Sequence, residues 1–323
     1  MATLRDIARH LDLSVTQVSR ALGDHADVSA ATKERVRQAA RTLGYRPNLA
    51  ARRLRSGRSG LVAMIVPTLA DRADRAILME TVMGLSAEFS ARGMQFVLHV
   101  LAPGEDAAAA HERLVRAGSF DGVVVTDPVI DDPRIATLDA LDVPFVVHGR
   151  DRAAPLYPFV DLDHHAIGRR LGEALIARGA RRIAWLGGPE NRLFDRTRRA
   201  GLEAALEAAG LALDPARVAS GSMSVARGRD DAPALAARGA DGIAAGNTML
   251  ALGARRALPG IMLAAHDDGL AGFGPDRIAA PYARTVSPLS LAWRPLCDAL
   301  DAAIARRDPQ QVILIADPDH ATA

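Results

Sequence analysis

The chain has 323 residues, enough for two or three domains, and its 49% apolar and 24% charged residues are typical of an ordinary globular protein. No apolar run approaches the roughly 18 residues that a membrane span needs, and the N-terminus lacks the pattern of a secretory signal. A single cysteine, Cys297, excludes an internal disulfide framework and cysteine-rich metal sites. These features favour a cytoplasmic protein that does not enter the membrane.

Charge is distributed unevenly along the chain. Residues 1–60 hold 12 basic and five acidic residues, whereas the remainder holds 28 basic and 33 acidic residues. A basic head on an acidic body is expected when only the head meets phosphates. A solvated basic surface is the alternative interpretation. It does not explain why the charge gathers on the segment that also carries the pattern described next.

Two capped amphipathic segments near the N-terminus predict short helices. A cap at Thr3 predicts a helix over Leu4–Leu11, and a capping box of Ser14 with Gln17 predicts a second helix that starts at Val15. Apolar residues recur on one face of the second helix, which leaves its first turns polar and outward-facing. Two short helices joined by a tight turn predict a helix-turn-helix, whose second helix enters the DNA major groove.

A third helix and a short segment complete this region. Ser29 caps a helix predicted over residues 30–43, Gly44 stops it, and Tyr45 closes a small core. After Pro47, Asn48 can cap a segment over residues 49–55. An isolated helix this short is marginal in water, so we expect it to be disordered unless DNA or a partner chain holds it. Residues 56–60 have the composition of a linker.

From Leu61 onward, apolar runs bounded by turn residues alternate with amphipathic stretches. The predicted strands are Leu61–Val66, Gln95–Leu101, Gly122–Thr126, Phe145–His148, Arg182–Leu186, Gly242–Ala245, Ile261–Ala265 and Val312–Ile315. The predicted helices include Ile77–Arg92, Ala107–Ala117, His165–Arg178, Arg196–Ala209 and Ser290–Arg306. This alternation predicts two parallel sheets covered on both faces, with ligands beyond the carboxyl ends of the strands.

The whole chain resembles a LacI/GalR-family transcriptional regulator. The specific matches lie at residues 3–8, 13–22, 28–29, 32, 35–36, 43–48, 50–51 and 54. Weaker matches lie at residues 120–124, 160–163, 181–188, 198–201 and 266–268. The resemblance implies an α/β fold in which a helix-turn-helix head and a hinge helix precede a type I periplasmic-binding-protein-like core of two Rossmann-like subdomains.

The resemblance also implies where the domains lie. The helix-turn-helix domain is expected at residues 1–46, the hinge helix and linker at 47–60, and the core, which binds effector and dimerises, at 61–323. Within the core, the N-subdomain is expected at about 61–158 plus 289–308. The C-subdomain is expected at about 159–288 plus 309–323.

The resemblance assigns DNA contacts to particular residues. Val15, Thr16 and Arg20 are expected at base edges of the major groove, since methyl groups suit thymine and an arginine fork suits guanine. Ser14, Ser19 and Asn48 are expected to position the DNA backbone. Hinge residues Ala51 and Leu54 are expected in the minor groove, where Leu54 is an apolar wedge at the central base step. A buried role for Val15 and a dimer-core role for Leu54 are the alternatives.

Effector contacts are assigned in the same way. Arg198 and Asp267 match an arginine and an acid that face each other across the family's ligand crevice and can bind hydroxyls. His148 and Arg150 follow another strand and resemble positions in members that respond to sugars, and Asn247 follows a further strand. Phe194 can stack on an apolar sugar face, as can Trp185 and Tyr157, although ordinary core packing is the simpler role for an aromatic residue. Arg198 as a surface residue and Asp267 as a helix cap are the alternatives.

Three departures from the family pattern lie in the C-terminal half. The usual Asn-Asp pair is replaced by Asn247-Thr248, and the stretch between Leu252 and Ile261 is shorter than usual. The C-terminal residues also lack the usual ending.

Two other classes of protein remain as alternatives. An enzyme is disfavoured because the chain carries no Walker-A loop, nucleophile elbow, zinc-protease motif or complete dinucleotide fingerprint. Asp161, Asp163, His164 and His165 could suggest a metal site, but Asp163 before a helical stretch is more simply a helix start. An exported solute-binding protein fits the core but not the attached head.

The sequence therefore predicts a regulator of sugar-uptake or catabolic genes that is a homodimer, with a tetramer as the alternative. It would bind pseudo-palindromic operator DNA and respond to a small polar effector, most simply a sugar, or else a nucleobase or another ligand. Neither a cofactor nor a metal is expected.

Overall fold

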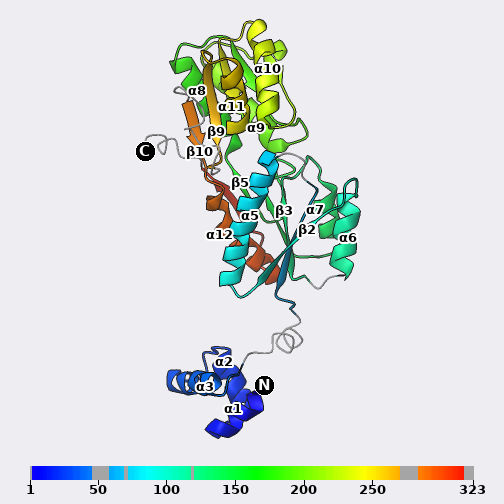
Figure 1. Cartoon of the computed structure of the whole chain (residues 1–323), viewed down its shortest axis with the longest axis vertical. Coiled ribbons are helices and arrows are strands. Elements are labelled where there is room, and N and C mark those ends of the chain that lie inside the picture. The colour runs from blue at the N-terminus through cyan, green and yellow to red at the C-terminus, as the bar shows by residue number, and fades with distance from the viewer. Residues whose placement is uncertain (1, 46–57, 69–71, 118–119, 270–282, 316–323) are drawn as a thin grey trace. The chain divides into compact units, whose positions relative to one another are not determined.

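The computed structural model describes residues 2–45, 58–68, 72–117, 120–269 and 283–315 (Figure 1). The chain divides into two compact units, a head of residues Met1–Ser59 and a core of residues Gly60–Ala323. Among the described helices, none is both long enough and apolar enough to cross a membrane.

The head consists of α1 (Leu4–Leu11), α2 (Val15–Leu22) and α3 (Ala30–Thr42). The capping box that starts α2 is formed, because the Gln17 amide donates to Ser14 Oγ at 3.1 Å and the Ser14 amide donates to Gln17 Oε1 at 3.0 Å. The prediction of three helices is confirmed. The third ends one residue early because Leu43 is its cap and Gly44 follows with a φ of +63°.

The core of the head is small and apolar. Ile7, Val18 and Val36 come one from each helix and are fully buried. Tyr45 packs against this cluster, as the sequence predicts. Burying these side chains stabilises three helices that are individually too short to persist in water.

The first core sheet has six parallel strands in the order β11-β5-β4-β3-β1-β2. Its strands are β1 (Leu61–Val66), β2 (Gln95–Val100), β3 (Gly122–Thr126), β4 (Phe145–His148), β5 (Phe159–Leu162) and β11 (Gln311–Leu314). Its helices are α5 (Arg72–Ala91), α6 (Ala107–Ala117), α7 (Pro133–Ala140) and α12 (Ser290–Ile304).

The second core sheet has five parallel strands in the order β10-β9-β8-β6-β7. Its strands are β6 (Ile183–Leu186), β7 (Val218–Ala219), β8 (Gly242–Ala245), β9 (Met262–Asp267) and β10 (Ala283–Val286). Its helices are α8 (His164–Ala177), α9 (Leu193–Ala208), α10 (Val225–Ala237) and α11 (Thr248–Ala257), with a 3-10 turn at Pro215–Arg217.

Both faces of each sheet are covered by helices. In the first sheet, Val62 and Met64 pack toward α5 and α12, whereas Ala63 packs on the opposite face toward α7. In the second sheet, Trp185 packs toward α8 and α9, and Leu186 packs toward α10 and α11. Because successive residues face opposite layers and both layers are apolar, the strands are continuous apolar runs.

The predicted strands are found within two residues of their positions, but β5, β7 and β10 were not predicted. β5 and β10 contain polar residues, Asp161 in one and Arg284 in the other, and β7 has only two residues. Strand β11 pairs with β5 in the first sheet, so residues 159–162 and 311–314 lie with the first subdomain. Our expectation that they belong to the C-subdomain was wrong, because β5 continues the first sheet beside β4 before the chain enters α8, and β11 returns to that sheet after α12.

Helices α8 and α9 lie unusually close together. A Cβ atom added to Gly168 would lie 1.7 Å from the Arg198 carbonyl oxygen, and one added to Gly201 would lie 2.0 Å from the His165 carbonyl oxygen. Only glycine permits this approach. The close contact brings the first turn of α8 against the Arg198 turn of α9.

Candidate functional site

The first turn of α2 presents an unusual exposed surface. Val15 has 41% of its surface exposed although it is apolar, and Thr16 is exposed beside it. Val18, one turn further along the helix, is fully buried. The capped start of α2 therefore presents methyl groups to solvent while the opposite face holds the head together, which is the arrangement that a major-groove reader needs.

Arg20 lies on the exposed side of α2 and is paired with an acid. Its Nη2 lies 2.7 Å from Asp27 Oδ2, and both side chains are about half exposed. The hydrogen bond and charge of Asp27 raise the pKa of the Arg20 guanidinium, and Arg20 lowers the pKa of the Asp27 carboxyl. The neighbouring acid, Asp24, instead pairs with Lys33 and Arg37 of α3, each at 3.1 Å.

The other predicted DNA-contacting residues differ in how far the structure describes them. Ser14 Oγ is engaged in the cap of α2, and Ser19 is partly buried. Asn48, Ala51 and Leu54, together with the predicted hinge helix, lie outside the described residues.

A second group of polar side chains lies in the core, where residues of the first sheet meet helices of the second. We name Asp161, His164, Arg198, His266 and Asp268 the junction cluster. His164 Nε2 lies 2.9 Å from Asp161 Oδ1, and Arg198 Nε donates to His164 Nδ1 at 3.1 Å. Arg198 Nη1 also donates to the Gly246 carbonyl oxygen after β8, at 2.5 Å.

The hydrogen bonds determine the protonation state of His164. Because Arg198 can only donate, Nδ1 of His164 carries the lone pair and Nε2 carries the proton that is donated to Asp161. Burial lowers the pKa of His164, with Arg198 contributing, which agrees with a neutral ring. Burial opposes ionisation of Asp161, but His164 and Arg150 outweigh it and hold the pKa of this carboxyl well below its usual range.

His266 and Asp268 complete the junction cluster. His266 is fully buried, and its Nε2 lies 3.2 Å from Asp268 Oδ1. Burial, with the charge of Arg198, lowers the pKa of His266 to about 4. Burial disfavours the Asp268 carboxylate, but His266 and Arg198 outweigh that effect and lower its pKa. The cluster therefore holds two neutral imidazoles between charged groups.

Besides Arg198, two predicted effector residues, Arg150 and Phe194, contact this cluster, whereas the hydrogen bond of Asn247 and the ring contact of His148 are with residues outside it. Arg150 Nε donates to Asp161 Oδ2 at 2.7 Å, and the Phe194 ring lies 5.3 Å from the Arg198 guanidinium and 5.6 Å from the His164 ring. Asn247 lies directly after Gly246, and its Oδ1 accepts the Leu250 amide as the cap of α11. The His148 ring, at the end of β4, lies 6.0 Å from the Trp293 ring.

Asp267 is placed differently from its neighbour. Its carboxylate accepts the Gly269 amide at 2.8 Å and Arg284 Nη1 at 3.3 Å. Asp268 is the acid that lies against His266. The resemblance assigns the effector-site acid to Asp267, whereas the acid beside His266 is Asp268, because successive residues of an extended chain point to opposite sides.

Sequence reasoning missed the central members of the cluster. Asp161 and His164 were considered for a metal site, and Asp161 and His266 also lie in stretches that match the family, but none of the three was assigned to the effector site. In the ranges that the structure describes, no group of three or more His, Cys, Asp or Glu residues could hold a metal ion. Asp163 caps α8 by accepting the Ala166 amide at 2.9 Å, which confirms the simpler prediction of a helix start.

A separate bridge links the loop after β3 to the start of α9. Arg192 Nη2 lies 2.7 Å from Asp127 Oδ2, and the Ile130 amide donates to the Asn191 carbonyl oxygen at 2.9 Å. Asp127 follows a strand of the first sheet, whereas Arg192 directly precedes α9 of the second subdomain. This bridge and the junction cluster are thus two polar connections between the halves of the core.

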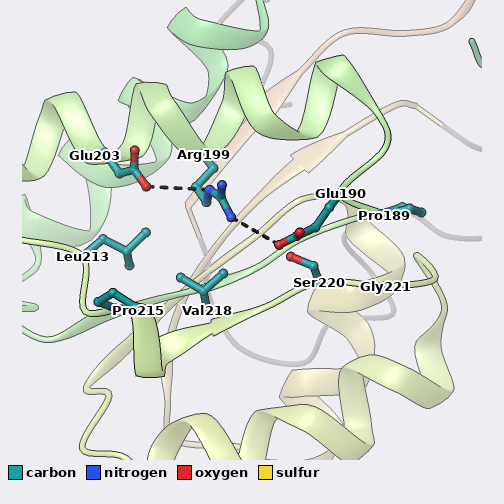
Figure 2. A pocket seen from close by; sticks show the side chains of 9 residues that line it. All are labelled: Pro189, Glu190, Arg199, Glu203, Leu213, Pro215, Val218, Ser220 and Gly221. Atoms are coloured by element: carbon teal, nitrogen blue, oxygen red, sulfur yellow. Dashed lines mark ion pairs between the residues drawn. The ribbon is translucent and has the colours of Figure 1, made fainter. Parts of the chain in front are cut away.

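A cavity of about 800 Å³ lies beside α9 and the edge strand β7, and it is distinct from the junction cluster. Figure 2 shows Arg199 between Glu190 and Glu203, with each ion pair at 3.7 Å. The remaining lining residues are Pro189, Leu213, Pro215, Val218, Ser220 and Gly221. Arg198 and Arg199 are neighbours in sequence, but only Arg199 lines this cavity.

Two family models match the chain. Residues 3–48 match the bacterial regulatory proteins of the lacI family, and residues 60–269 match the periplasmic binding proteins and sugar binding domain of the LacI family. The second match alone covers more than half of the chain, and the two follow the order of the head and the core.

Individual relatives agree with these models. The chain is 38% identical over 300 residues to the HTH-type transcriptional regulator AglR of Rhizobium meliloti (strain 1021), covering 90% of this chain and 84% of that protein. It is 35% identical to the HTH-type transcriptional regulator RafR of Escherichia coli over 210 residues, covering 65% of this chain and 62% of that protein. These relatives are transcriptional regulators rather than enzymes.

Solved structures show the same fold. The complex of the transcriptional regulator CelR with cellobiose has a TM-score of 0.70 and 28% identity, and the match covers 98% of each chain. The lac repressor dimer bound to operator and the anti-inducer ONPF has a TM-score of 0.73 at 24% identity, covering 98% of this chain and 97% of that one. The exposed start of α2, the two-sheet core and these matches together show that the chain is a DNA-binding transcriptional regulator that belongs to the LacI family.

Proposed function

We propose that this regulator represses genes of sugar uptake or catabolism from the cytoplasm, and that a sugar bound at the junction cluster controls its affinity for operator DNA. The chain of contacts from Arg150 through Asp161 and His164 to Arg198 carries this proposal, because it links the first sheet to the second subdomain. A ligand that breaks or replaces one of these bonds acts on both halves of the core at once.

The chemistry of the cluster suits a polyhydroxylated ligand. Arginines supply only donors, carboxylates supply only acceptors and neutral imidazoles supply both, whereas a sugar hydroxyl can donate and accept. Phe194 adds an apolar ring beside the guanidinium of Arg198, and such a ring can pack against the C–H face of a sugar. The solved complex of CelR with cellobiose supports this ligand class for a related protein.

Control of DNA binding would follow from differential affinity for two arrangements of the core. The Asp127–Arg192 pair and the junction cluster both connect the halves in the described arrangement. A sugar that binds another arrangement of the core more tightly shifts the equilibrium toward that arrangement. The DNA-binding heads are then presented to the operator in a different geometry. A ligand with equal affinity for both arrangements would change nothing.

On the DNA side, we propose that Val15, Thr16 and Arg20 contact base edges in the major groove. Their exposure on a capped helix supports this role. Ser14, Ser19 and Asn48 would position the phosphate backbone, and Ala51 and Leu54 would contact the minor groove.

We further propose that the protein binds a pseudo-palindromic operator as a homodimer. The dimer surface would be the apolar face of α5 and edge strand β2, where Met79, Met83, Leu98 and Val100 are 59%, 65%, 37% and 49% exposed. Met83→Asp should give a monomer in size-exclusion chromatography with light scattering. Leu156→Asp, at a residue that is 89% exposed elsewhere on the core, is the matched control and should leave a dimer. An unchanged dimer in Met83→Asp contradicts this surface.

The function itself can be tested in two steps with the full chain. Selection from random DNA should enrich a palindrome, and a thermal-shift screen of sugars and nucleobases should find a stabilising sugar that alters binding to that palindrome. Stabilisation by a nucleobase alone would place the ligand in another class. Turnover of the sugar would favour the enzyme alternative, and tight sugar binding without any effect on DNA would favour a solute-binding protein.

A further inference from the structure

The pair of Arg20 and Asp27 gives the exposed face of the head a feature that base contacts alone do not require. The 2.7 Å separation of Arg20 Nη2 from Asp27 Oδ2 is that of a charge-assisted hydrogen bond. Asp27 belongs to the loop between α2 and α3, and α2 itself contains no acidic residue. The loop therefore supplies the Asp27 carboxylate to Arg20, because α2 has no acidic residue of its own to pair with this guanidinium.

An exposed acid at this position works against simple attraction to DNA. Phosphates supply most of the affinity of a DNA-binding head, and a carboxylate next to them is repelled. Asp24, in the same loop, offers an instructive comparison because it pairs with Lys33 and Arg37 of α3, neither of which is assigned to base edges. Asp27, in contrast, pairs with Arg20, which is assigned to a base edge.

The geometry of the guanidinium indicates what the carboxylate does. Guanidinium is a planar fork with five N–H donors, and a guanine takes two of them through O6 and N7. A carboxylate at Nη2 fixes the rotation of this plane and leaves donors for a base. It also opposes contact of the same arginine with a phosphate, since the carboxylate and the phosphate carry like charge.

We propose that Asp27 is a specificity-determining residue that holds Arg20 for a guanine of the operator and away from phosphates. This inference rests on the proposed base-reading role of Arg20. Asp27 thus lowers the affinity for DNA in general and raises the discrimination between sequences. Without its charge, Arg20 contacts phosphates, and the protein binds different sequences with more similar affinities.

Asp27→Asn in the full-length protein removes the charge and keeps the size of the side chain. The operator is first obtained by selection from random DNA, and the base pair read by Arg20 is identified as the one at which Arg20→Ala loses preference. Binding is then measured by fluorescence anisotropy at several salt concentrations, for the selected operator and for the variant with A·T at that pair.

The wild type should prefer G·C at this pair, and Asp27→Asn should reduce the preference by about tenfold while binding unrelated DNA more tightly. Its binding should also depend more steeply on salt, by up to roughly one unit in the logarithmic slope, because Arg20 gains a phosphate contact. Asp27→Glu retains the charge and should restore much of the preference. Asp24→Asn, the matched control, should leave the preference at wild-type strength.

Three outcomes overturn the inference. An unchanged preference in Asp27→Asn, with circular dichroism showing an intact head, removes Asp27 from specificity. An equal loss in Asp24→Asn shows a general effect of charge rather than orientation of Arg20. A wild-type protein without any sequence preference refutes the proposed function itself, which is a separate failure.

Discussion

The head and the core use the same residue types in opposite environments. In the head, Arg20 and Asp27 form an ion pair with about half of each side chain exposed. In the junction cluster, Arg198 and His164 are only 4% and 6% exposed. The exposed pair is well solvated without a ligand, whereas the buried groups depend on one another for hydrogen bonds.

This difference determines what a substitution does in each region. A change on the exposed start of α2 alters recognition and leaves folding largely intact, because water replaces what is lost. A change in or near the junction cluster leaves a buried polar group without its partner and lowers stability together with ligand affinity. The following predictions test this contrast, from the largest expected effect to the smallest.

Gly201→Val should destabilise the core most strongly. The new side chain would meet the His165 carbonyl oxygen at the close contact of α8 and α9, so we expect a loss of about 3 kcal/mol in the free energy of unfolding. Denaturant unfolding can be followed by tryptophan fluorescence, since Trp185 and Trp293, the two tryptophans of the chain, both lie in the core. Gly260→Val is the control because a Cβ there meets open space. Equal midpoints for the two variants contradict the close packing.

Acid should destabilise the core through its buried histidines. An unfolded histidine binds a proton near pH 6.5, whereas His266 remains neutral in the fold down to about pH 4. The unfolded chain therefore binds more protons between pH 6.5 and pH 4. As the pH is lowered through this window, His266 alone should reduce the free energy of unfolding by about 1.4 kcal/mol per pH unit. His266→Gln should flatten the slope of stability against pH. A wild-type stability that stays level from pH 6.5 to 4 refutes this assignment.

Arg198→Ala should weaken binding of the sugar identified in the screen by roughly 30-fold, since hydrogen bonds to charged groups contribute about 1.5–3 kcal/mol. A fluorescence titration of the full chain measures this affinity. Arg199→Ala is the matched control, because Arg199 is the next residue on α9 but lines the separate cavity beside β7. Equal affinities for the two variants would remove Arg198 from the ligand site.

Exchanging Val15 and Thr16 should change which operator is preferred by about tenfold, the scale of a single good base contact. Selection from random DNA with the variant and the wild type measures the change. Glu34→Ala, at an exposed residue of α3, serves as the control and should leave the selected sequence unchanged. A uniform loss for all sequences would point to misfolding rather than altered reading.

Ser14→Ala should have the smallest effect, a loss of about 1 kcal/mol confined to the head, because it removes the side-chain cap of α2. Hydrogen exchange of the amides of α2 measures this local opening free energy. Ser14→Asp provides another capping oxygen and should recover most of the protection. Faster exchange in α8 or α9 as well would show that the effect is not confined to the head.

The contrast also explains which features the sequence could predict. The helices of the head are determined by local contacts. Ser14 bonds to Gln17 within one turn of α2, and Gly44 follows the last helix, so the spacing of residues alone predicts these helices. The strands of the core are legible because each is a continuous apolar run between turns. Strand β5 was missed because Asp161 interrupts its apolar pattern, although that same residue anchors the junction cluster.

The candidate site was harder to predict because its contacts join distant parts of the chain. Arg198 and His164 are 34 residues apart and meet because α8 and α9 pack at glycines. No local pattern encodes such a meeting. The choice between Asp267 and Asp268 depends on how β9 ends, and periodicity does not determine that point.

Strand β11 and helix α12 have a consequence for synthesis of the protein on the ribosome. The five-stranded subdomain is encoded without interruption between β5 and α12, so its strands can assemble as soon as β10 has emerged. The six-stranded sheet is begun first, at β1, but its edge strand and the helix that buries one of its faces are translated last. The subdomain that starts the core is therefore completed after the five-stranded one, and a ribosome that stops before α12 releases a chain with a complete helix-turn-helix head and an incomplete first sheet.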